Sequence, residues 1–152
     1  MKVIIFLITL ISFLNADQYT FLLNKYDKEL ELDAKIISNI ATASIKGEIK
    51  LVNPEISNIE SEDYYKFFIL TNSCEDATFI FIKKSININS LCKSDNNQIF
   101  FTNNYEKLLK DNRYLGAFFW NKSRPNITFI KARLEKQKIE LSKDYDKFVE
   151  DF

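Results

Sequence analysis

Apolar residues recur every three or four positions between residues 19 and about 45, and charged residues fill most of the positions between them. This spacing places the apolar side chains on one face of a helix, so the segment predicts an amphipathic helix whose stripe faces a core. The same stripe is also typical of a helix that lies on a membrane surface or binds a partner. Gly47 follows in the manner of a helix cap, and residues 48–52 have the pattern of a short strand that ends at Asn53 and Pro54.

Several later segments are rich in aromatic and β-branched residues, which favour strands. Residues 77–82 form a nearly unbroken apolar run, as expected for a strand that is covered on both faces inside a parallel or mixed sheet. The other predicted strands lie at residues 64–70, 99–102, 115–120 and 126–130. Residues 121–125 separate the last two strands and suit a five-residue connection in a β-hairpin.

Helices are expected between and after these strands. Residues 105–110 predict a brief helix directly behind the strand at 99–102, and a strand followed by a helix indicates an α/β layout. Ser142 is placed as the N-cap of a terminal helix that runs through Tyr145, Phe148 and Val149. The polar segments at 55–63, 71–76 and 85–97 are expected to be connections, the last with room for a short helix.

The pattern as a whole predicts an α/β fold. We expect a single three-layer-like domain with a mixed, mostly parallel sheet, an N-terminal amphipathic helix, a C-terminal β-hairpin and a terminal helix. Residues 1–16 stand outside this domain, because Lys2, an apolar run to Leu14 and the small Ala16 have the three-part layout of a secretory signal peptide. The run is shorter than the roughly 20 residues that span a bilayer, so we expect cleavage after Ala16.

Cleavage would leave the 136 residues 17–152, a length that suits one domain with an adequate core. The mature protein is expected to be soluble in the periplasm. If residues 1–16 were retained as an anchor, the fold prediction would stand but the solubility prediction would not. The chain is rich in Ile, Asn, Lys and Phe, a bias that suggests a bacterial source.

The charged residues and the absence of histidine exclude several classes of function. Basic and acidic residues number 21 each, so the chain has no basic excess of the kind that nucleic-acid binding requires. Without histidine there is no imidazole base for a Ser/His/Asp or Cys/His system, and zinc, copper and haem sites lose their commonest ligand. The acidic clusters at 60–63 and 75–76 lack the ligand spacing of a calcium loop. We therefore expect no cofactor, no metal and no enzyme activity, although catalysis by two carboxylates alone remains an alternative.

Cys74 and Cys92 are the only cysteines. In an exported chain such a pair predicts one structural disulfide, and the alternative is a redox-sensing or exchange role. The 17 residues between them would form a closed loop, which on the chain-entropy model stabilises the fold by about 3 kcal/mol. The spacing excludes a Cys-x-x-Cys oxidoreductase.

The order of elements resembles that of the YfiR-like periplasmic proteins, a group of small exported α/β domains. The resemblance rests on the early helix, on Cys74 followed by the buried run at 79–82, and on the short strand at 99–102. It continues through the glycine-led hairpin and through the segment from Ile139 to Ser142 that leads into the terminal helix. Family members usually show a paired glycine at the start of the hairpin, whereas this chain has Gly116 alone there.

This resemblance implies a non-enzymatic periplasmic protein that binds and restrains the periplasmic part of an inner-membrane signalling enzyme, typically a diguanylate cyclase. It also implies that a disulfide between Cys74 and Cys92 would affect that regulation. The partner is accordingly expected to be an inner-membrane or other envelope protein, and the sequence leaves the oligomeric state open.

The abundance of aromatic residues points weakly in the same direction. Fourteen Phe, seven Tyr and one Trp are more than a core of this size must hide, and aromatic and Arg side chains are favoured interface anchors. The predicted partner-binding residues are Trp120 and Arg124 at the end of the hairpin, with Tyr114 and Phe119 behind them. The alternative is that Phe119 and Trp120 simply alternate on an ordinary strand, one inward and one outward.

A second class of function is a periplasmic domain that binds a small ligand or an envelope component. Such a domain would use a cleft at the carboxyl ends of the strands, lined by the loops after Ile82 and Thr102. A deep pocket with convergent polar groups would favour this class, whereas a flatter apolar patch would favour a protein regulator.

Overall fold

The computed structural model describes residues 28–56, 58–83, 86–87, 92 and 98–152. A helix at residues 28–44 comes first. It is followed by β1 (Lys50–Val52), α2 (Asn58–Tyr65), β2 (Ile69–Leu70), β3 (Phe79–Ile82), β4 (Ile99–Thr102), α4 (Tyr105–Lys110), β5 (Tyr114–Asn121), β6 (Arg124–Ile130), α5 (Lys131–Gln137), the 3-10 helix η1 (Lys143–Phe148) and β7 (Val149–Glu150). Residues 1–16 lie outside the described residues, so the signal peptide stays a prediction.

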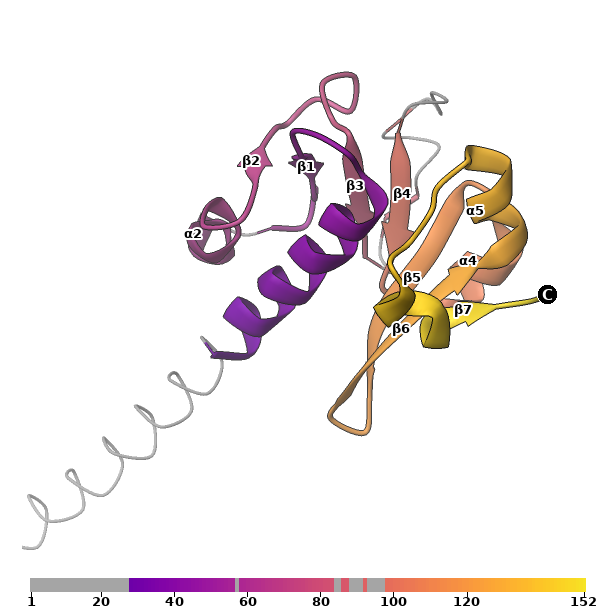
Figure 1. Cartoon of the computed structure of the whole chain (residues 1–152). Helices are drawn as coiled ribbons and strands as arrows, with labels where there is room; N and C mark the ends of the chain where they lie inside the picture. The colour runs from indigo at the N-terminus through magenta and orange to yellow at the C-terminus, as the bar shows by residue number, and fades with distance from the viewer. Residues whose placement is uncertain (1–27, 57, 84–85, 88–91, 93–97) are drawn as a thin grey trace, which may run out of the picture.

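The strands form one sheet in the order β2-β1-β3-β4-β5-β6-β7 (Figure 1). Neighbours from β2 to β5 run parallel, β5 and β6 pair antiparallel, and β7 joins β6 in parallel. The prediction of an α/β domain with a mixed, mostly parallel sheet and a C-terminal hairpin is therefore confirmed.

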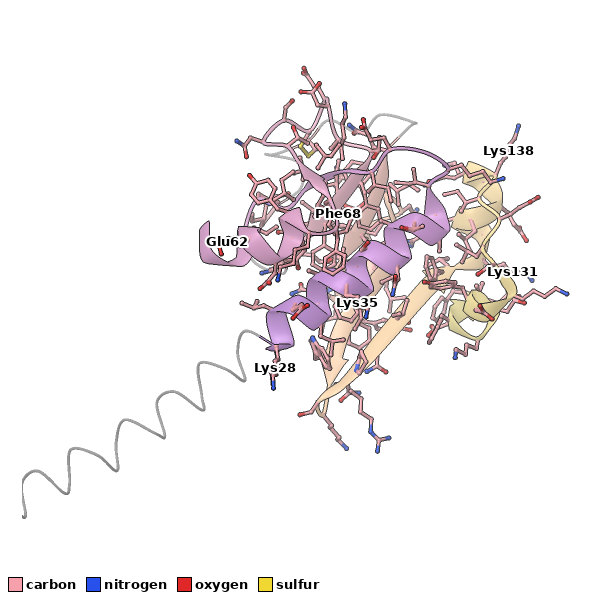
Figure 2. The ribbon with its side chains drawn as sticks, turned by 60° about the vertical axis from the view of Figure 1, so that its left-hand side comes forward. Lys28, Lys35, Glu62, Phe68, Lys131 and Lys138 are labelled. Atoms are coloured by element: carbon pink, nitrogen blue, oxygen red, sulfur yellow. A yellow bond between two sulfur atoms is a disulfide. The ribbon has the colours of Figure 1, made fainter. Side chains whose placement is uncertain are left out.

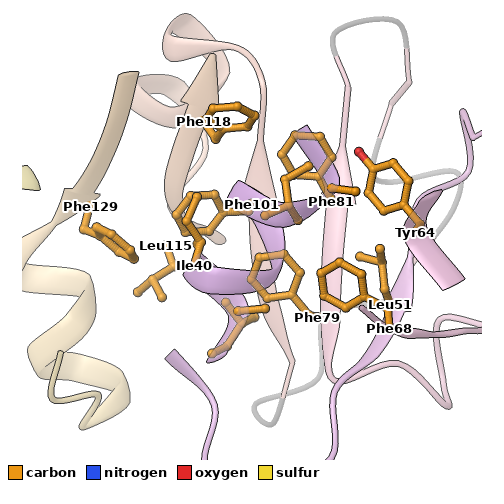
Figure 3. Close-up of a cluster of buried hydrophobic side chains, with 14 of the residues drawn as sticks. Ile40, Leu51, Tyr64, Phe68, Phe79, Phe81, Phe101, Leu115, Phe118 and Phe129 are labelled. Atoms are coloured by element: carbon orange, nitrogen blue, oxygen red, sulfur yellow. The ribbon is translucent and has the colours of Figure 1, made fainter. Parts of the chain in front are cut away.

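Helices cover both faces of this sheet, which gives the predicted three layers. Successive residues of a strand point to opposite faces, so Phe79 and Phe81 join one buried cluster while Ile80 and Ile82 join another. The first cluster lies under the helix at 28–44, α2 and α5, and the second lies under α4. Figure 3 shows the first cluster, with aromatic rings from β3, β4 and β6 filling the space between sheet and helix.

The helix at 28–44 confirms the described part of the amphipathic prediction. Its buried side chains are Ala34, Ile37, Ile40 and Ala41, spaced as a core-facing stripe. Gly47 is not its cap, because the helix ends at residue 44 and Gly47 lies three positions later with a φ of 137°. The last turn is instead closed by the Ser44 hydroxyl, which donates to the Ile40 carbonyl over 2.8 Å.

The strand predicted at 64–70 is wrong for most of its length. Tyr64 and Tyr65 end α2, and only Ile69 and Leu70 form β2. The reason is packing, since the rings of Tyr64 and Phe68 lie four positions apart and stack at 6.1 Å between centroids, both buried in the first cluster. Packing both rings against the same cluster outweighs the preference of aromatic residues for strands.

The hairpin has a shorter turn than the five residues expected. Asn121 pairs with Arg124, which leaves Lys122 and Ser123 as a two-residue turn with φ values of 49° and 60°. Two positive φ values in succession characterise the type I′ turn, whose twist matches that of the flanking strands. Neither residue is the Gly or Asn that usually signals this turn, so the sequence concealed it.

The C-terminal region also departs from expectation. α5 was not predicted. It ends at Gln137, and the following residue, Lys138, caps it with a φ of 56° that allows its N–H to donate back to the Leu134 and Glu135 carbonyls. The predicted terminal helix is the 3-10 helix η1, and Val149 belongs to β7. Ser142 does precede η1, but its side chain makes no capping hydrogen bond.

Candidate functional site

The four residues predicted to bind a partner do not form one surface. Tyr114 is only 1% exposed within the second cluster, so it has no area to offer to a partner. Phe119 and Trp120 point to opposite faces of β5, and Phe119 packs against the Tyr105 ring at 5.8 Å between centroids. Arg124 is exposed at the start of β6. Of the four, Trp120 and Arg124 are exposed. Trp120 pairs with Pro125 and Arg124 with Asn121, so their side chains point to opposite faces of the hairpin.

Trp120 joins the hairpin to the helix at 28–44. Its indole N–H donates to the Asp33 carboxylate over 2.7 Å, and its ring meets the edge of Phe118 at 6.1 Å between centroids. The side chain is nevertheless 40% exposed. These two contacts fix the orientation of the tryptophan side chain.

A groove of about 560 Å³ lies between this helix and the hairpin tip. Its described lining is Glu29, Leu30, Leu32, Asp33, Lys83, Trp120 and Ser123. Figure 2 shows the first turns of the helix, near Lys28, running past the tip of the β5–β6 hairpin. The groove combines an apolar surface with acidic and basic groups, as the rim of a protein interface does.

The helix residues of this groove were missed from the sequence. Leu32 is 43% exposed and lies off the apolar stripe that faces the core. An apolar residue outside the stripe was the available signal, but its place in a groove becomes evident only once the hairpin is known to lie beside it. Asp33 gave no such signal, because a charged residue on the outer face of a helix is ordinary.

Glu29 and Asp33 are one helical turn apart and both line the groove. Side chains four positions apart on a helix are neighbours, so the two acids lie on the same side of the groove. Asp33 already accepts the indole N–H of Trp120. Among the described residues, no three Cys, Asp or Glu side chains gather to hold a metal ion.

Cys74 and Cys92 form the predicted disulfide, with 5.6 Å between their Cα atoms. The bridge ties the loop after β2 to the chain ahead of β4, and Cys92 is buried in the second cluster. The Gln98 side chain supports the same loop, because its amide N–H₂ donates to the Cys74 carbonyl and, over 3.3 Å, to the Ala77 carbonyl.

A second cavity, of about 270 Å³, lies beside this disulfide at the carboxyl ends of β1 and β2. Its described lining is Val52, Asn53, Pro54, Thr71, Asn72 and Cys74. A cleft at the carboxyl ends of strands was expected, but at the loops after Ile82 and Thr102. The chain after Ile82 lies largely outside the described residues, and after Thr102 the Asn104 side chain is used to cap α4 by accepting the Lys107 N–H over 2.9 Å.

Three pKa shifts belong to structural contacts outside the tryptophan groove and the cavity beside the disulfide. The Arg113 guanidinium, bonded to Asp111, lowers the pKa of that carboxyl. Burial lowers the pKa of Arg133, whose guanidinium donates to the carbonyls of Leu108, Asp111 and Tyr114 and so ties α5 to the link between α4 and β5. Burial likewise raises the pKa of Tyr114 to about 12.

The fold and its sites define a small α/β domain with one disulfide, an exposed tryptophan groove and a cavity at the carboxyl end of its sheet. No protein-family model, curated protein or solved structure matches this chain. In the part of the chain that is described, no helix is both long and apolar enough to cross a membrane.

Proposed function

We propose that this chain is an exported, non-catalytic regulatory protein of the bacterial cell envelope. It binds the periplasmic part of an inner-membrane protein through the groove between the helix at 28–44 and the β5–β6 hairpin. The observation that carries the proposal is the exposed, oriented side chain of Trp120 in that groove. The resemblance to YfiR-like proteins suggests a signalling enzyme such as a diguanylate cyclase as the partner.

Trp120 has the properties of an interface anchor. Its N–H is already bonded to Asp33, so a partner that covers the ring leaves no indole donor unsatisfied. Leu32 adds a second exposed apolar side chain to the same groove. Arg124 is exposed on the hairpin next to Ser123, which lines the groove, but Arg124 is not itself part of the described lining. Tryptophan and arginine dominate the binding energy of many interfaces.

The predicted location and the disulfide also support the proposal. Disulfides persist in the periplasm and are rare in the cytosol, so the Cys74–Cys92 bridge fits export. The absence of histidine removes the commonest general base, which favours a binding role over catalysis.

Capture from bacterial envelope membranes tests the proposal. The mature protein, with its disulfide intact, is expected to retain an inner-membrane protein that has a periplasmic domain. The double variant Trp120→Ala/Arg124→Ala is expected to lose that capture while keeping its thermal unfolding transition. The matched control is Leu109→Ala, because Leu109 is 46% exposed but lies on α4, over the other face of the sheet. Equal capture by the double variant, or capture of no membrane protein by the wild type, would contradict the proposal.

The ligand-binding alternative is favoured by a separate observation. The cavity at the carboxyl ends of β1 and β2 is lined by Asn53, whose buried Nδ2 has no hydrogen-bond partner among the described residues. That cavity is distinct from the tryptophan groove, so the two roles do not compete for the same residues.

A further inference from the structure

We propose that a pocket at the free edge of β6 binds a small zwitterion whose cationic end is a methylated ammonium group. This edge pocket has a volume of about 440 Å³. β6 contributes residues 125–128 to it, and the aromatic and charged side chains around them are those of Tyr105, Phe119, Lys147, Phe148 and Glu150. Its described lining shares no residue with that of the tryptophan groove, so the inference does not depend on the proposed partner.

The pocket forms because β7 covers only the end of β6. β7 pairs with Phe129 and Ile130, and within the described part of the chain no strand pairs with residues 125–128 on that side. η1 leads into β7 and borders the open edge with Lys147 and Phe148. The start of β6 and the end of η1 are therefore two walls of one recess.

Glu150 is a carboxylate held in place in this recess. Its Oε2 accepts the Tyr105 hydroxyl over 3.0 Å, and its Oε1 accepts the Thr128 hydroxyl over 3.2 Å. Thr128 is only 4% exposed, so the second bond holds the carboxylate against the sheet. Both hydroxyls are neutral, and no described residue forms a salt bridge with Glu150. A cationic ligand would supply the counter-charge that this half-buried carboxylate lacks.

Lys147 lines the same pocket with the opposite charge. Its Nζ lies over the Phe148 ring, 4.9 Å from the centroid, and it forms no salt bridge with Glu150 or with another described residue. One pocket thus holds an anion and a cation that are not paired with each other. A ligand with both charges complements both side chains, whereas a ligand with one charge complements one and is repelled by the other.

The rings around the pocket favour a methylated ammonium over a bare one. The Tyr105 ring packs against Phe119 at 5.8 Å between centroids, tilted by 57°, and Phe148 packs against Tyr145 at 6.1 Å. Aromatic faces attract a cation through their quadrupole and also give apolar surface to its methyl groups. Both Glu150 oxygens already accept a hydroxyl. A quaternary ammonium has no N–H, so it adds its charge without competing for these bonds.

Glycine betaine and three analogues test the inference in the full-length mature protein. 3,3-Dimethylbutanoate has the same shape without the positive charge, choline lacks the carboxylate, and glycine lacks the methyl groups. The backbone amide signals of Ile127 and Thr128 are expected to shift saturably with glycine betaine, with a millimolar Kd. We expect 3,3-dimethylbutanoate to bind about tenfold more weakly, and choline and glycine about threefold or more. No saturable shift with glycine betaine, or binding of any analogue as tight as that of glycine betaine, would overturn the inference.

Two variants assign each charge of the ligand to its side chain. Glu150→Gln keeps the size of the side chain, and it is expected to lose most of the preference for glycine betaine over 3,3-dimethylbutanoate. Lys147→Gln is expected to lose the preference over choline instead. The matched controls are Glu140→Gln and Lys143→Gln, which are exposed residues outside the described lining and should keep both preferences. Preferences that both pocket variants retain would overturn the inference, and the wild-type ligand series decides it even if Glu150→Gln does not fold. Trp120→Ala should leave glycine betaine binding unchanged, which separates this pocket from the partner groove.

Discussion

Gly116 is the position at which the packing of the sheet allows no side chain. A β-bulge interrupts the pairing of β4 with β5, so Phe100 faces Tyr114 while Phe101 faces Gly116. A Cβ at Gly116 would overlap the Phe101 ring and the Thr128 carbonyl oxygen. Gly116→Ala therefore forces a fully buried ring or a paired backbone to move.

The cost follows from what surrounds that ring. Phe101 is stacked against Phe79 at 5.7 Å and meets the edge of Phe129 at 5.2 Å between centroids. An inserted methyl in a packed core costs about 1–3 kcal/mol, and weakening an aromatic pair adds about 0.5–1.5 kcal/mol. We expect Gly116→Ala to lower the free energy of unfolding by about 3 kcal/mol and the Tm by about 10 °C.

Urea unfolding of the wild type, Gly116→Ala, Phe101→Leu and the double variant measures the loss of stability and tests whether the Phe101 ring causes it. Phe101→Leu removes the ring edge that the new methyl would meet. The free energy of unfolding lost in the double variant is therefore expected to be smaller than the sum of the losses in the two single variants. The expected coupling is about 1 kcal/mol or more. A Gly116→Ala protein within about 0.5 kcal/mol of the wild type would refute the packing argument, because substitutions without such a mechanism stay in that range.

Two further predictions concern the disulfide and the alkaline limit of stability. Replacing Cys74 and Cys92 by Ser is expected to lower the free energy of unfolding, measured in urea, by about 3 kcal/mol, because no closed loop then restrains the unfolded chain. A variant as stable as the oxidised wild type would contradict this prediction. Burial raises the pKa of Tyr114 from 10.0 to about 12. The contribution of the buried neutral phenol to the free energy of unfolding is therefore fully present below pH 10 and is lost as the pH rises toward 12. Tyr114→Phe should therefore lose less stability than the wild type over that interval, and parallel stability curves would contradict the burial argument.

The elements that the sequence predicted well are those whose local pattern and packing agree. Phe79–Ile82 and Ile99–Thr102 are apolar throughout and occupy the middle of the sheet, and Asn104 is both a strand terminator and a helix cap. Tyr64 and Tyr65 were misassigned because tertiary packing outweighed their strand preference. The turn at Lys122 and Ser123 was hidden because neither residue type signals positive φ.

The two sites were predictable to different degrees. Trp120 was predicted as a contact residue because tryptophan and arginine near a hairpin end are typical of interfaces. Its hydrogen-bond partner Asp33 was not predicted, because it lies 87 positions away and no local pattern links the two residues. The α/β pattern predicted a ligand cleft at the loops after Ile82 and Thr102, whereas the observed cavity lies after β1 and β2. The lining of that cavity was not predicted, because the position of β1 between β2 and β3 depends on strand order, which a single sequence does not reveal.

The tryptophan groove and the cavity beside the disulfide give the two candidate functions separate physical bases. The groove presents exposed apolar and charged side chains held by a hydrogen bond between helix and hairpin. The cavity presents the buried Nδ2 of Asn53, which lacks a partner within the described residues. The first arrangement is typical of a protein surface and the second of a small-molecule site.

The most direct test of the central claim is the affinity of the purified mature protein for the periplasmic domain of the inner-membrane protein that it captures. Calorimetry should give a Kd that rises by about 30-fold or more in Trp120→Ala/Arg124→Ala, because the loss of anchors costs at least about 2 kcal/mol. Leu109→Ala should leave the Kd unchanged. A Kd for the double variant within about twofold of the wild type, with the fold intact, would contradict the assignment of the groove as the binding surface.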